Sequence, residues 1–243
     1  MAGHSKWANI KHRKSKADAL KGKLFSRTSK EIITAAKLGG PDPASNARLR
    51  LAIQKAKDVN LPNDNIDRLI KKAANVDQDA YEEMQYELYG HQGVGIIVDV
   101  MSSNKNRISS EIRIATNKRG GTIAHPGAVA FNFDRKGVLY VPRKNALENE
   151  LFEIVTNAGA EDFTEAEESY IITCEPQELL KVKEAIGHLG FDCKDAQVEM
   201  IPKNYVECDL ENAKANLALI EWLENIDDVD AVFHNMKIPD ELL

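Results

Sequence analysis

Ten lysine and arginine residues lie between residues 6 and 37, a stretch whose acidic residues are Asp18 and Glu31. They are Lys6, Lys11, Arg13, Lys14, Lys16, Lys21, Lys23, Arg27, Lys30 and Lys37. Each phosphate that such a surface neutralises releases a condensed counterion. Binding would therefore weaken with salt at a log–log slope of about −0.9 per contact on duplex DNA, or about −0.7 on a single strand. A solvated, lysine-rich helix face is the alternative, but the length of the basic stretch favours phosphate binding.

One aromatic residue, Trp7, stands among these cations, between Lys6 and the cluster Lys11-His12-Arg13-Lys14. An aromatic ring can stack on an unpaired base, which contributes roughly 1–3 kcal/mol, and proteins that read RNA sequence mostly bind splayed bases. Packing of Trp7 against the helices that follow is equally open. The candidate nucleic-acid contacts from these residues are Lys6, Trp7, Lys11, His12, Arg13, Lys14, Lys16, Lys21, Lys23, Arg27 and Lys30.

A second basic group follows Asn104, in a segment whose apolar spacing predicts a helix. Its cations are Lys105, Arg107, Arg113, Lys118 and Arg119, opposed by Glu111. Two interpretations are open: an auxiliary phosphate contact, and an ordinary solvated helix.

Signatures of catalysis and of metal binding are missing from the sequence. No G-x-S-x-G, P-loop or H-E-x-x-H pattern occurs. The six histidines and three cysteines lack metal-ligand spacing, and a nuclease that used His12 would lack a visible partner residue. Gly90-x-x-Gly93 matches the short loop of KH domains, but strands flank it, so we expect a hairpin turn. We therefore predict a protein that is not an enzyme and that uses no metal or cofactor.

The cellular location is predicted from apolar runs and cysteines. No run approaches the ~18 apolar residues of a membrane-spanning helix, and the start of the chain lacks the apolar core of a secretory signal. Cys174, Cys193 and Cys208 are odd in number and far apart, which fits buried thiols in a reducing compartment. We expect a cytoplasmic protein that does not contact membranes.

Charge divides the chain into two parts. Residues 1–75 carry 17 Lys and Arg against 6 Asp and Glu, whereas residues 76–243 carry 15 against 32. Such an asymmetry suggests that one end binds a polyanion while the other stays solvated, or offers a surface to protein partners.

Hydrophobic periodicity predicts an α+β fold in three domains. Three helices are expected in a basic helical domain, residues 1–76, with breaks at Gly39–Pro43 and Leu61–Asn63. Residues 135–202 form one βαββαβ unit, the ferredoxin-like pattern. The segment 77–134 has two strands, Tyr86–Gly90 and Val94–Met101, then a helix and short strands near Val129–Phe133. It lacks the helix Leu210–Asn225, capped by Asp209, and the strand Ala231–His234 that follow the βαββαβ unit. We therefore expect residues 77–134 and 203–243 to form one discontinuous α+β domain into which 135–202 is inserted.

Several longer motifs resemble one known family. They are AGHSKWANIKHRK (2–14), Gly22-Lys23, GGPDP (39–43), NARLRLAI (46–53), NLPNDNIDRLIKKA (60–73), NKNRISSEIR (104–113), FDRKG (133–137) and DDVDAVFHN (227–235). Together they resemble the YebC family, also called the PmpR or probable transcriptional regulatory protein family, over essentially the whole chain. The resemblance implies a helical head followed by two α+β domains. It adds Asn9 to the candidate contacts, because Asn9 stands in the opening motif.

The resemblance leaves the nucleic acid undecided. Bacterial members of the family are labelled cytoplasmic DNA-binding transcriptional regulators, whereas mitochondrial relatives look like translational activators and some bacterial members are tied to ribosomes. DNA, and rRNA or tRNA on the ribosome, are both open, and so is an adaptor that contacts only proteins. This chain departs from the family at His91-Gln92, where Pro-Gly is common, at Asn46-Ala47, where Asn-Pro is common, and at residues 122–126.

Overall fold

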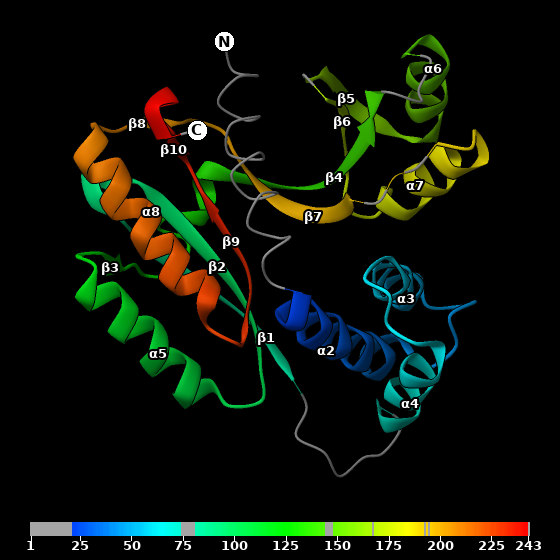
Figure 1. Ribbon diagram of the computed structural model, residues 1–243, viewed down its shortest axis with the longest axis horizontal. Coiled ribbons are helices and arrows are strands. Elements are labelled where there is room, and N and C mark those ends of the chain that lie inside the picture. The colour runs from blue at the N-terminus through cyan, green and yellow to red at the C-terminus, as the bar shows by residue number, and fades with distance from the viewer. Residues whose placement is uncertain are drawn as a thin grey trace. The chain divides into compact units, whose positions relative to one another are not determined.

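The computed structural model describes residues 21–73, 81–143, 148–166, 168–191, 193 and 195–242. They divide into two compact units. One unit runs from Phe133 to Lys203, and the other holds the described residues before Phe133 and after Lys203 (Figure 1). None of the described helices is both long and apolar enough to cross a membrane.

Three helices begin the described chain, as the periodicity predicts: α2 (Lys21–Gly39), α3 (Ala47–Asp58) and α4 (Asn63–Ala73). Asn46 organises the turn before α3. Its Oδ1 accepts the N–H of Leu49 at 3.0 Å, and its Nδ2 donates to the carbonyl oxygen of Ala35 at 2.8 Å. This cap satisfies an otherwise orphaned N–H of α3 and ties it to α2. The helices bury a shared apolar core of Ile32, Ile33, Ala35, Ala36, Leu49, Ala52, Ala56, Leu61, Ile66 and Ala73.

The same unit contains a four-stranded antiparallel sheet of order β3-β1-β2-β9. Its strands are β1 (Glu82–Tyr89), β2 (Gly95–Ser102), β3 (Thr122–Ile123) and β9 (Val229–His234). The turn between β1 and β2 is the short 3-10 helix η1 (His91–Gly93), so the hairpin predicted there is confirmed. β9 comes from the far end of the chain and pairs with β2, Ile97 opposite Phe233.

Two helices, α5 (Lys105–Lys118) and α8 (Leu210–Asn225), contact each other over one face of this sheet (Figure 1). α8 begins at its predicted cap, Asp209, which accepts from the N–H of Asn212. α5 begins at Asn104, which accepts from the N–H of Arg107. Ile108, Ile112, Leu219 and Leu223 are among the fully buried residues between these helices and the sheet. A two-stranded parallel pair, β8 (Val206–Glu207) and β10 (Met236–Lys237), and the 3-10 helix η4 (Asp240–Leu242) complete this unit.

The unit from Phe133 to Lys203 is a second antiparallel sheet covered by two helices. In chain order its elements are β4 (Phe133–Pro142), α6 (Glu148–Ala158), β5 (Ala160–Glu165), β6 (Ser169–Cys174), α7 (Leu179–His188) and β7 (Asp195–Pro202). The sheet order is β5-β6-β4-β7. α6 packs beside α7, and α7 contacts the central strand β4 (Figure 1).

The prediction of short strands near Val129–Phe133 is wrong. Residues Ala130–Asn132 form the 3-10 helix η2, and β4 begins only at Phe133. Gly137 lies inside this strand. A Cβ at Gly137 would lie 2.9 Å from Cys174 Sγ and 3.1 Å from Leu179 Cβ. The glycine therefore permits close packing of β4 against β6 and α7, which a glycine inside a strand often indicates.

Candidate nucleic-acid interface

The basic N-terminal stretch is only partly within the described structure. Lys6, Trp7, Asn9, Lys11, His12, Arg13, Lys14 and Lys16 lie outside the described residues. Lys21 and Lys23 lie in the first turn of α2, but their side chains also lie outside the described part. Of the twelve candidates, the structure thus places the side chains of Arg27 and Lys30.

Lys30 lies against the turn between α8 and β9. Its Nζ is 2.6 Å from Asp228 Oδ1 and donates to the carbonyl oxygen of Asp227 at 3.1 Å. The Lys30 side chain is 13% exposed, and its ammonium group lies 5.8 Å from the centre of the Tyr81 ring. Arg27, one turn earlier on α2, donates from Nη2 to the carbonyl oxygen of Glu224 at 3.4 Å. Both residues contact Glu224, Asp227 or Asp228 near the end of the chain, which gives them a structural role.

Asp228 connects three elements of this unit. Besides Lys30 of α2, it accepts hydrogen bonds from Ser102 at the end of β2, at 2.6 Å, and from Arg107 of α5. Burial disfavours the ionised carboxylate, but the bonds from Lys30, Ser102 and Arg107 outweigh it and lower the pKa of Asp228 from 3.8 to about 2. The carboxylate therefore stays ionised at neutral pH and joins α2 to the sheet and to α5.

Two other arginines of the helical region bind neighbouring segments of the chain. Arg48 Nε lies 2.8 Å from Glu31 Oε1, and its Nη2 is paired with Glu83 of β1. Arg50 donates to the carbonyl oxygens of Pro43 and Ala44, at 2.8 and 2.9 Å. These cations organise the α2–α3 loop and its surroundings.

The structure reveals a group of exposed cations that the sequence reasoning left out. Lys57 lies in the last turn of α3, and Arg68, Lys71 and Lys72 lie on the outer face of α4. The i, i+3, i+4 spacing of the last three could have identified this face from the sequence. Cations in the last turn of a helix also complement its dipole, so this group has a structural use as well.

The five cations of the second basic group have different environments. Arg107 binds Asp228, and the guanidinium carbon of Arg119 lies 5.3 Å from the centre of the Trp222 ring. Lys105, Arg113 and Lys118 are exposed on α5 and, within the described residues, form no ion pair. α5 therefore offers three available cations for an anionic ligand.

The atypical pair His91-Gln92 is held by its own set of hydrogen bonds. Gln92 has a positive φ of 54°, a conformation that glycine adopts more readily. Its Nε2 donates to Asp209 Oδ2 at 2.6 Å, and its Oε1 accepts the N–H of Asp209 at 3.1 Å. His91 Nε2 donates to the carbonyl oxygen of Arg119 at 2.7 Å. Side chains on this turn thus connect it to the N-terminus of α8 and the C-terminus of α5.

Two family models match the chain over nearly its whole length. The model of the TACO1/YebC protein N-terminal domain matches residues 5–76, and that of the TACO1/YebC second and third domain matches residues 81–236. The chain belongs to the TACO1/YebC family. The resemblance seen in the sequence motifs is thereby confirmed.

Individual proteins are similar to this chain over nearly its whole length. A probable transcriptional regulatory protein of Protochlamydia amoebophila is 68% identical over 242 residues, which cover 100% of this chain and 99% of the relative. A probable transcriptional regulatory protein of Chlamydia muridarum is 58% identical, covering 97% of this chain and 100% of the relative. The crystal structure of a conserved hypothetical protein from Aquifex aeolicus superposes with a TM-score of 0.85 at 42% identity, covering 93% of this chain and 94% of that one.

Proposed function

We propose that this TACO1/YebC protein is a non-enzymatic, cytoplasmic regulator of gene expression that binds nucleic acid through its basic N-terminal region. The observation that supports the proposal is the charge step, from 17 cations against 6 anions in residues 1–75 to 15 against 32 in the remainder. A polyanion attracts the first part and repels the second, which orients the protein on its target. The names of the two bacterial relatives agree with a regulatory role.

The proposed surface combines the candidates whose side chains lie outside the described residues with those cations of α5 that form no ion pair within them. They are Lys6, Trp7, Asn9, Lys11, His12, Arg13, Lys14, Lys16, Lys21 and Lys23, with Lys105, Arg113 and Lys118 of α5 as auxiliary contacts. Lys57, Arg68, Lys71 and Lys72 extend the cationic surface of the helical region. Arg27, Lys30 and Arg107 are excluded because each binds an oxygen of the C-terminal segment.

The proposal includes a division into three domains: residues 1–76, residues 77–134 with 203–243, and an inserted ferredoxin-like domain, residues 135–202. The pairing of β9 with β2 supports the discontinuous domain, because it joins the two ends of the second segment in one sheet. The strand order β5-β6-β4-β7, with all neighbours antiparallel, supports the ferredoxin-like assignment.

Fluorescence anisotropy with labelled duplex DNA and labelled stem-loop RNA tests nucleic-acid binding. A triple charge reversal, Lys11→Glu, Arg13→Glu and Lys14→Glu, should weaken binding by more than about tenfold and reduce the dependence on salt. The matched control reverses Lys181, Lys214 and Lys237, three exposed lysines of the acidic part. Undiminished affinity of the first variant, or equal losses in both, would contradict the proposal.

A second candidate function is translation, through rRNA or tRNA on the ribosome. Trp7 within the cationic stretch favours it, since an aromatic ring among cations can stack on an unpaired RNA base. Sucrose-gradient sedimentation of a lysate, with the triple variant alongside, distinguishes the two functions. Wild-type protein that travels with ribosomal fractions, while the variant does not, would support translation. Protein that stays at the top of the gradient yet shifts promoter DNA would support transcription.

A further inference from the structure

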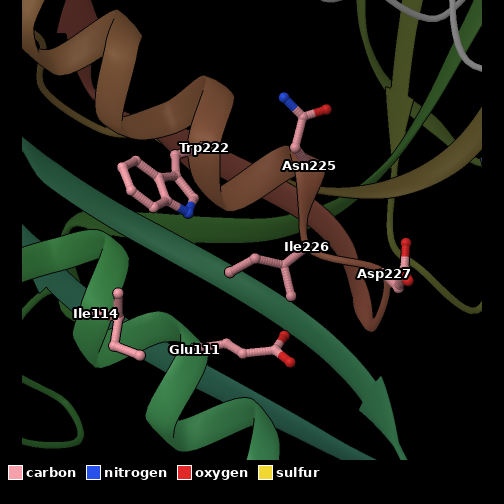
Figure 2. Close-up of a pocket in the computed structure, with 6 residues that line it drawn as sticks. All are labelled: Glu111, Ile114, Trp222, Asn225, Ile226 and Asp227. Atoms are coloured by element: carbon pink, nitrogen blue, oxygen red, sulfur yellow. The ribbon is translucent and has the colours of Figure 1, made fainter.

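A shallow groove separates α5 from the C-terminal end of α8. Figure 2 shows its six lining residues: Glu111 and Ile114 from α5, and Trp222, Asn225, Ile226 and Asp227 from the end of α8 and the turn after it. Its volume is about 300 Å³, enough for one or two large side chains. The groove lies within one compact unit of the chain and contains none of the candidate nucleic-acid contacts.

Three of the six residues that line the groove are apolar. Ile114 is 51% exposed, although the rest of the outer face of α5 is polar. Across the gap, Trp222 is partly buried and packs against the core, and Ile226 is 7% exposed. A single exposed isoleucine is ordinary. One that faces a tryptophan across an open groove presents apolar surface that a partner could cover.

The charged residues that line the groove are both acidic. Glu111 and Asp227 stand at its edge, and neither forms an ion pair within the described residues. Arg107 binds Asp228 and also interacts electrostatically with Glu111 and Asp227, and Arg119 lies over Trp222. The contact of Arg119 with Trp222, 5.3 Å from guanidinium carbon to ring centre, is within cation–π range. The indole ring of Trp222 therefore already contacts one guanidinium group of this chain.

We propose that this groove binds a basic segment of a partner protein. The head group of an arginine or lysine of that segment would lie between Glu111 and Asp227. Neighbouring aliphatic groups would cover Ile114, Trp222 and Ile226. Nucleic acid is a poor occupant, because its phosphates would meet two carboxylates. The proposal does not depend on the basic N-terminal region and so goes beyond nucleic-acid binding.

Tryptophan fluorescence tests the groove in the full-length protein. The chain has two tryptophans, so a Trp7→Phe background leaves Trp222 as the reporter. The probes are a blocked Leu-Arg-Leu-Arg-Leu peptide, the same peptide with glutamates in place of arginines, and single-stranded oligouridylate. The arginine peptide should change the Trp222 emission saturably, and the other two should not.

Matched variants connect the signal to the groove. Glu111→Gln with Asp227→Asn should weaken binding of the arginine peptide about fivefold or more, and so should Ile114→Ser. The control Glu211→Gln with Asp240→Asn removes the same charge at exposed sites elsewhere in the unit and should bind like the parent. Equal affinity of the two double variants would overturn the proposal. A response to oligouridylate in place of the peptide would overturn it too, because the groove would then take nucleic acid.

Discussion

Lys30 Nζ lies 2.6 Å from Asp228 Oδ1, across 198 positions of the chain. The pair is largely withdrawn from solvent, with side chains 13% and 6% exposed. It joins the basic helical region to the sheet whose last strand Asp228 precedes. A lysine that the sequence presents as one of many surface cations thus has a structural role.

Removal of the Asp228 carboxylate should destabilise this junction. Asp228→Asn removes the negative charge that Lys30 and Arg107 share and replaces one acceptor oxygen with an N–H donor. It leaves the Lys30 ammonium mostly buried without a counterion. We expect a loss of about 2–4 kcal/mol in the free energy of unfolding, measured by urea denaturation. Asp227→Asn is the control, because Lys30 contacts Asp227 through its main-chain oxygen. Equal stability of the two variants would show that the ion pair contributes little.

The same carboxylate should make stability depend on pH in the acidic range. Its pKa in the folded protein is about 2, below the ordinary value of 3.8. A lowered folded-state pKa means that the unfolded chain takes up the proton first. The contribution is therefore complete above pH 4 and disappears as the pH falls from about 4 to 2. Thermal melts of wild type and Asp228→Asn should differ most at neutral pH and converge only as the pH falls to about 2. A constant difference across this range would exclude the ionised carboxylate as its cause.

Glu87 on β1 should hold the loop that precedes β4. Its carboxylate, 7% exposed, accepts the N–H groups of Gly127, Val129 and Ala130 at 2.5, 2.6 and 2.7 Å. Burial raises its pKa, but these three bonds outweigh burial and lower the pKa below its usual value. Glu87→Gln replaces an acceptor with a donor, which we expect to cost about 1–3 kcal/mol.

Hydrogen exchange reports on this loop directly. The amides of Gly127, Val129 and Ala130 should exchange about tenfold faster or more in Glu87→Gln than in wild type. Glu82→Gln, at an exposed position of the same strand, is the control and should leave them unchanged. Unaltered protection in Glu87→Gln would show that other contacts order the loop.

Substitution of two glycines by alanine in the unit from Phe133 to Lys203 should change the stability of the fold in opposite directions. Gly137→Ala places a Cβ 2.9 Å from Cys174 Sγ and 3.1 Å from Leu179, so we expect a loss of about 1–3 kcal/mol. Gly187→Ala, within α7, meets no atom within 4 Å and should stabilise the fold by about 0.4–1 kcal/mol. Thermal unfolding of both variants measures the difference. Similar effects of the two substitutions would contradict the packing argument.

Local chemistry in the sequence determined most of the helices. α8 occupies Leu210–Asn225, with Asp209 as its cap, as predicted. The prediction of α8 is correct because capping and apolar spacing depend on residues that lie within a few positions of each other. Helix α5 and the β1–β2 hairpin follow for the same reason. The prediction of strands at Val129–Phe133 failed because a distant residue holds this loop. Glu87, 40 positions before Gly127, accepts the N–H of that residue.

The family also follows from the sequence alone, because its motifs are long and cover the whole chain. The charge step of the chain predicts that it binds a polyanion. Which cations remain available for that target is decided by tertiary structure. Lys30 and Arg107 read as phosphate contacts until the fold brings Asp228 beside them, 198 and 121 positions away. The groove at Trp222 likewise exists only where α5 and α8 meet. Charge and periodicity are properties of neighbours along the chain, whereas an ion pair or a groove requires two distant segments to be placed together.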